Sequence, residues 1–117
     1  MIKDRKIKFV RLKEIMQSIA SKYNERILDI PNNKISLSMT LSSICKDLND
    51  KKDVTYLGSL FYSRQISGIR IIASGGTTKL HDKTFSNYGS NCEKYPFLPY
   101  ATFAAAIGIT DTEVSIK

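Results

Sequence analysis

The chain has 117 residues, enough for one domain at most, and 42% of them are hydrophobic, so a small core is possible. A net charge of +7 and a pI of about 9.5 favour an acidic partner such as RNA, DNA or anionic lipid. No apolar run is long enough to span a bilayer and no signal-peptide core follows Met1, so we expect a cytoplasmic protein without membrane contact.

The first predicted element is a long basic helix over about residues 3–24. Apolar residues recur there at a helical spacing, and no Gly or Pro interrupts residues 1–30. Residues 1–26 carry eight cations and three acids, and therefore +5 of the net charge. A solvated helix face explains such a lysine-rich run most simply, and a phosphate-binding face is the alternative that stays open.

A loop and a strand are predicted next. Pro31 and two asparagines indicate a loop over residues 29–34. The segment KISLSMTL (34–41) alternates strictly between apolar and polar side chains, which predicts a half-buried strand with its hydroxyls outward. Serines at the start of SSICKDLNDKKD (42–53) are typical helix caps, so we expect a short helix there.

A second helix is predicted from Val54 to Arg64, where the apolar spacing is again helical. Asp53 is its expected N-cap, and Gly68 is expected as the left-handed residue at its C-terminal end. The segment IRIIAS (69–74) then predicts a strand, on which Arg70 faces solvent or a neighbouring domain.

The C-terminal third carries weaker signals. Residues 75–96 are polar and rich in turn formers, with one short strand expected near residues 83–85. The segment YATFAAAIGIT (100–110) has the composition of a small-residue helix, and the capping-box pattern Thr110-x-x-Glu113 predicts the start of another. Four residues beyond the box cannot complete that helix, so we expect the natural domain to extend further. The element order predicts an α/β (α+β) sandwich, with helices packed on a small mixed or antiparallel sheet.

The sequence shows no self-contained catalytic or metal site. Cys45 and Cys92 are far apart and His81 is the only histidine, so we expect no zinc site and two thiols in a reducing compartment. The segment SGGTTK (74–79) lacks the GxxxxGK[ST] spacing of a phosphate loop. Arg64 is the better candidate: at a helix end it either complements the helix dipole or offers its guanidinium to a base or phosphate. Composition alone favours the dipole.

Three blocks of the sequence resemble one enzyme family, in the same order and at nearly the same spacing. They are YNERILDIPNNKISLSMTL (23–41), LGSLFYSRQISGIRII (57–72) and YPFLPYATFAAAIGI (95–109), about half the chain. They are similar to the C-terminal region of the O-phosphoseryl-tRNA(Sec):selenocysteinyl-tRNA synthase family (SepSecS, the soluble liver antigen/liver pancreas antigen family). Residues 74–94 depart from the family pattern, so no contact is carried over for that loop.

The resemblance implies a transferase dependent on pyridoxal 5'-phosphate (PLP), of fold type I (aspartate-aminotransferase-like). The family converts O-phosphoseryl-tRNA(Sec) to selenocysteinyl-tRNA(Sec) with selenophosphate, as a homotetramer. Residues 1–117 are then one small C-terminal domain, shortened at both ends relative to the full-length enzyme. The family's Schiff-base lysine and cofactor pocket lie upstream, so this chain alone is expected to have no catalytic, cofactor-binding or metal residue, to bind no PLP and to be inactive. Arg64 matches the family arginine that reads the unpaired discriminator base near the tRNA acceptor end.

Two other interpretations stay open at this point. The chain is either a free-standing basic RNA-binding or scaffold module without catalytic activity, or a purely structural lid without RNA contact. An in-frame cofactor domain upstream of Met1 would favour the enzyme, whereas a genuine start at Met1 would favour the module.

Overall fold

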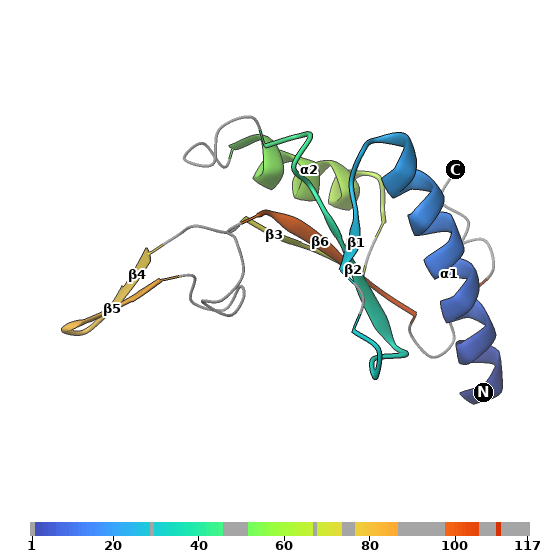
Figure 1. Ribbon diagram of the computed structural model, residues 1–117. Helices are drawn as coiled ribbons and strands as arrows, with labels where there is room; N and C mark the ends of the chain where they lie inside the picture. The colour runs from blue at the N-terminus through green and yellow to red at the C-terminus, as the bar shows by residue number, and fades with distance from the viewer. Residues whose placement is uncertain are drawn as a thin grey trace.

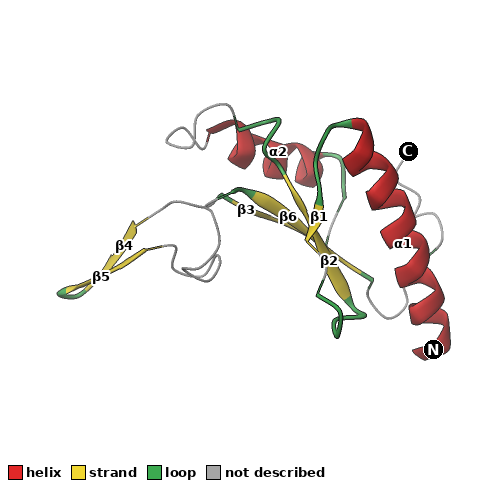
Figure 2. Ribbon diagram, viewed as in Figure 1, coloured by secondary structure: helices red, strands yellow, loops and turns green. Residues whose placement is uncertain are grey.

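The computed structural model describes residues 2–28, 30–45, 52–66, 68–73, 77–86, 98–105 and 110. They contain two helices, α1 (Ile2–Lys22) and α2 (Lys52–Ser63), and two antiparallel sheets (Figures 1 and 2). The larger sheet has the strand order β1-β2-β6-β3, and β4 and β5 pair with each other. The strand bounds are β1 (Ile27–Leu28), β2 (Ser36–Thr40), β3 (Ile69–Ile72), β4 (Thr77–Leu80), β5 (Lys83–Ser86) and β6 (Tyr100–Ala104). Helices on small antiparallel sheets confirm the predicted α+β class.

Both helices cover the same face of the four-stranded sheet. On this face Leu37 and Met39 of β2 lie opposite Phe103 and Ala101 of β6, because successive residues of a strand alternate between faces. The residues that α1 buries are three or four positions apart, so they form one stripe along the helix. One buried cluster joins these elements: Phe9, Leu12, Met16, Ala20, Leu37, Met39, Leu41, Val54, Ala101, Phe103 and Ala105. Its removal from water is the main force that holds the helices on the sheet.

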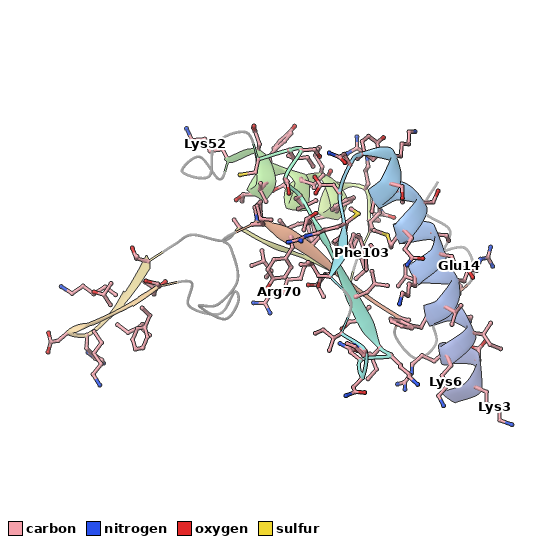
Figure 3. The ribbon with its side chains drawn as sticks, in the orientation of Figure 1. Lys3, Lys6, Glu14, Lys52, Arg70 and Phe103 are labelled. Carbon is pink, nitrogen blue, oxygen red and sulfur yellow. The ribbon has the colours of Figure 1, made fainter. Side chains whose placement is uncertain are left out.

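The opposite face of the sheet carries hydroxyl groups and one arginine. Ser38 and Thr102 face each other across β2 and β6, and their hydroxyl oxygens lie 3.0 Å apart. Arg70 pairs with Thr102 from β3, and its side chain points away from α2 (Figure 3). Arg70 is exposed, as predicted. The outward placement predicted for the hydroxyls of β2 is wrong for Thr40, which is only 2% exposed.

The segment predicted as a small-residue helix begins as a strand. Tyr100–Ala104 forms β6, which pairs with β2 on one side and β3 on the other. The helix propensity of alanine is overridden here because β6 is a central strand, whose backbone groups bond to a neighbouring strand on each side. The side chains of β6 alternate between the core and the open face of the sheet. Thr110 lies in no helix, and the rest of the helix predicted to start there lies outside the described residues.

Two further segments differ from the predictions. Residues 42–44 form a turn rather than the start of a short helix. The part of that predicted helix after residue 45, before the polar break at residues 49–53, lies outside the described part of the chain. The strand predicted near residues 83–85 is confirmed as β5, but its partner β4 was not predicted. A tight turn joins the two strands, with His81 at a positive φ of 51°. This β4–β5 hairpin lies apart from the four-stranded sheet (Figure 1).

Candidate nucleic-acid interface

Arg64 lies in a turn of fixed geometry directly after the last residue of α2. The Ile66 N–H donates to the Phe61 carbonyl, and the Gln65 N–H donates to the Tyr62 carbonyl, each at 3.0 Å. This hydrogen-bond pair is the Schellman motif, which requires a left-handed residue just beyond the helix. Gln65 is that residue, with a φ of 58°. The motif uses the last carbonyls of α2 and so fixes the backbone on both sides of Arg64.

Two predicted helix-end residues therefore need correction. Gly68 has the predicted positive φ, 83°, but α2 has already ended at the Gln65 turn, so Gly68 turns the chain into β3 instead. A Cβ added to Gly68 would meet nothing within 4 Å, so its need for glycine is purely conformational. Asp53 is not the N-cap because it lies within the first turn of α2, where its negative charge still complements the helix dipole.

The side chain of Arg64 is available to a ligand. The residue is exposed, and its guanidinium makes no ion pair within the described segments. Its backbone N–H, in contrast, lies 3.2 Å from the carbonyls of both Leu60 and Phe61. A guanidinium carries five N–H donors in a planar fork, which suits a carboxylate, a phosphate or the edge of a base. The turn thus combines a fixed backbone with a free planar cation.

A groove of about 500 Å³ lies between α2 and the edge strand β3, and its lining includes Tyr62 near the end of α2 but not Arg64. Thr55, Ser59 and Tyr62 line it from the helix. From the sheet side it is lined by Ile69, Arg70, Ile71 and Ala73. Gly58 lets the two elements approach closely, because a Cβ on it would lie 3.3 Å from Cγ1 of Ile71. The groove therefore presents hydroxyl groups opposite a wall of aliphatic residues that also includes Arg70.

The end of α1 has the same local motif as the end of α2. Asn24 takes the left-handed conformation, with a φ of 55°, and the Glu25 N–H donates to the Ala20 carbonyl at 2.8 Å. Asparagine is the commonest left-handed residue after glycine, so its position after the predicted helix is a signal that the sequence does contain.

A partly buried hydrogen-bond network follows this second turn, and sequence reasoning missed it. The Glu25 carboxylate accepts hydrogen bonds from the Thr40 hydroxyl and, at 2.6 Å, from the Ser43 N–H. The Thr40 hydroxyl also accepts from the Arg26 N–H at 3.0 Å. Burial of Glu25 acts to raise its pKa, but hydrogen bonds from Ser43, Thr40 and Ser42 outweigh this effect and hold the pKa below its ordinary value. The network ties the end of α1 to β2 and to the turn after it.

The residues that line the groove between α2 and β3, and those of a second groove beside α1, do not fit a bound PLP. The groove between α2 and β3 is lined by no lysine that could hold the cofactor. The second groove contains Lys6, Lys13 and Lys34, but no carboxylate lines it to pair with the pyridine nitrogen. In the described part of the chain, no three His, Cys, Asp or Glu residues are grouped so that they could hold a metal ion.

None of the described helices has the length and apolar character needed to cross a membrane.

Comparison with known proteins identifies the family. The family model described as O-phosphoseryl-tRNA(Sec) selenium transferase, SepSecS, matches residues 1–116. The chain belongs to the SepSecS family. A Caenorhabditis briggsae SepSecS relative named O-phosphoseryl-tRNA(Sec) selenium transferase is 33% identical over 107 residues, which cover 91% of this chain and 21% of the relative. A Caenorhabditis elegans relative of the same name is 29% identical with the same coverage, so the chain spans about one fifth of the length of the curated relatives it matches.

Proposed function

We propose that this chain supplies tRNA acceptor-end recognition to a selenium transferase that converts O-phosphoseryl-tRNA(Sec) to selenocysteinyl-tRNA(Sec) with selenophosphate. Membership of the SepSecS family and the name of its relatives support O-phosphoseryl-tRNA(Sec) as the substrate. The observation that carries the recognition role is the exposed guanidinium of Arg64 on a turn with a fixed backbone.

Arg64 is proposed to read the unpaired discriminator base of the tRNA. An unpaired guanine exposes O6 and N7, to which one guanidinium can donate two parallel hydrogen bonds. The Schellman motif at Gln65 supports this role because the backbone is already ordered before binding, so little backbone entropy is lost on binding. The hydroxyl-lined groove beside the turn leaves room for polar contacts to neighbouring nucleotides.

The chemical step is assigned to the rest of the enzyme. PLP would supply the electron sink for the reaction, and its site would lie on the larger part of the enzyme. The enzyme would act as a homotetramer in the cytoplasm, with catalytic centres formed between subunits. The lack of a lysine and carboxylate pair in either groove supports a binding role for the described residues. The chain incubated with PLP should therefore develop no absorbance band of a lysine-bound cofactor, and a stable band would contradict this division.

Replacement of Arg64 tests the recognition role. Arg64→Ala should weaken binding of tRNA(Sec) by roughly 1–3 kcal/mol, the scale of one bidentate arginine–base contact. Arg64→Lys should lose most of the same affinity, because an ammonium group cannot donate two parallel bonds to one base edge. Filter binding at one salt concentration measures the change, with Lys79→Ala on the β4–β5 hairpin as a charge-matched control. An Arg64→Ala affinity equal to that of the control would refute the proposal.

A further inference from the structure

A basic groove lies between the N-terminal half of α1 and the turn that precedes β2. Its volume is about 360 Å³. Three lysines line it, Lys6 and Lys13 from α1 and Lys34 from the turn, around an apolar floor of Phe9, Val10 and Pro31. Figure 3 shows Lys6 on the first turns of α1. The groove therefore combines positive charge with apolar surface, and none of the described acidic side chains lines it.

The turn that forms one wall of this basic groove is fixed by Asn33. Its side-chain oxygen accepts hydrogen bonds from the N–H groups of Ile35 at 3.0 Å and Ser36 at 3.1 Å. Its side-chain nitrogen donates to the Ser36 hydroxyl at 2.9 Å, and its own N–H donates to the Ile30 carbonyl at 2.9 Å. These bonds hold Lys34 at the rim of the groove, across from α1.

The helix that lines the groove carries an excess of positive charge. α1 contains seven cations and two acids, which leaves +5 on one helix. One of these acids, Asp4, is already paired at 3.1 Å with Lys8, which does not line the groove. A concentration of like charge over a low-dielectric floor produces a positive potential that attracts anions.

We propose that the basic groove binds the sugar–phosphate backbone of a tRNA, as a contact separate from Arg64. The lysines would contact phosphates, while ribose packs on Pro31 and on Val10, which is 55% exposed. This inference rests on the proposed function, because that function provides the RNA partner. An anionic membrane is less favoured, since most of the apolar side of α1 is buried against the sheet and cannot enter lipid.

The two contacts would have different roles. The groove lies at the N-terminal half of α1, whereas α2 lies toward the C-terminal end of α1 (Figure 1). Phosphate contacts position an RNA without reading its sequence, and base contacts specify it. The groove should therefore contribute affinity for any RNA of the right shape, and Arg64 should contribute preference for one base.

Salt dependence separates the groove from other positive charges. Each phosphate contact reduces affinity by a factor of roughly three between 50 and 200 mM salt, because bound counterions are released. Raising the salt from about 50 to 200 mM weakens tRNA(Sec) binding by some factor in the unmodified protein. In the double variant Lys6→Ala/Lys34→Ala of the full chain, which lacks two phosphate contacts, this factor should be about tenfold smaller. Lys79→Ala/Lys83→Ala removes two exposed lysines of the β4–β5 hairpin and should leave the salt dependence unchanged. Lys6→Arg/Lys34→Arg should retain it.

The outcomes distinguish this inference from the proposed function. Equal salt dependence in the groove and hairpin double variants would overturn the groove proposal. If the groove double variant lost binding to phosphatidylserine vesicles but bound tRNA unchanged, the groove proposal would also be overturned, in favour of a membrane role. Arg64→Ala should lower affinity at every salt concentration with little change in slope. If Arg64→Ala weakens binding but the groove variant behaves as its control, only the groove proposal fails.

Discussion

The two helices end in the same motif, but the residues that follow have different environments. After α1, the left-handed residue Asn24 leads into Glu25, whose carboxylate is bound by Thr40 and Ser43. After α2, the left-handed residue Gln65 is exposed and so is Arg64 beside it. A Schellman motif therefore fixes the chain direction in both places, while tertiary contacts decide whether the turn stabilises the fold or remains available to a ligand.

The same contrast applies to the charged groups at the two turns, the Glu25 carboxylate and the Arg64 guanidinium. The Glu25 carboxylate is partly buried and its hydrogen bonds come from the protein, so its contribution is to stability. The guanidinium of Arg64 is exposed, so its removal should change binding more than folding.

Removal of the Thr40 hydroxyl should have the largest effect on stability. Thr40→Val keeps the shape of the side chain but removes one donor from the Glu25 carboxylate and the acceptor of the Arg26 N–H. We expect a loss of about 2 kcal/mol in the free energy of unfolding, because both groups are partly buried. Urea denaturation measures it, with Ser38→Ala as the control: this hydroxyl bonds only Thr102 among the described residues. Equal losses for the two variants would contradict the central place of Thr40 in the network.

A side chain that resists the left-handed conformation should break the turn after α2. Gln65→Val should cost about 1–2 kcal/mol, because a β-branched residue at a φ of 58° is strained. Gln65→Gly should be neutral or stabilising, and Asn24→Val gives the matched change at the end of α1. Thermal denaturation compares the three variants. Gln65→Val should also weaken tRNA(Sec) binding, whereas Asn24→Val should not; the reverse order would contradict the contrast between the two turns.

The smallest effect is expected in the acid dependence of stability. The folded-state pKa of Glu25 lies below its ordinary value of 4.5, so its stabilising contribution is present above that value and is lost as pH falls through the folded pKa. Glu25→Gln should therefore flatten the decline of the urea midpoint between pH 5 and pH 3 (roughly the range in which carboxylates titrate). Glu14→Gln, an exposed glutamate of α1 outside the network, should leave the decline unchanged. The same flattening in both variants would show that Glu25 has no special role.

Local signals in the sequence predicted the elements whose pattern is local. The helical spacing of Ile7, Val10, Ile15 and Ile19 predicted α1, but Ile7 and Val10 are exposed and the helix buries Phe9, Leu12, Met16 and Ala20 instead. The alternation over residues 34–41 predicted β2. The family resemblance, confirmed by the match over residues 1–116, singled out Arg64, and the structure places it on an exposed turn. Its role in reading a base stays a prediction.

Non-local contacts account for what the sequence did not show. β6 contains alanines that favour a helix, and only its pairing with β2 and β3 makes it a strand. Gly68 is the obvious left-handed residue in the sequence, but α2 ends before it, at the Gln65 turn. Gln65 adopts the left-handed conformation because the N–H groups of Gln65 and Ile66 bond to carbonyls of α2. The lysines of α1 are visible in the sequence, whereas Lys34 joins them only through the turn that Asn33 fixes.

The most direct test of the central claim combines Arg64→Ala with a change of the discriminator guanine to adenine in tRNA(Sec). If Arg64 reads this base, each change alone should weaken binding by roughly 1–3 kcal/mol, and both together should cost little more than either alone. Strictly additive losses would mean that Arg64 and the discriminator base do not interact, and would contradict the account.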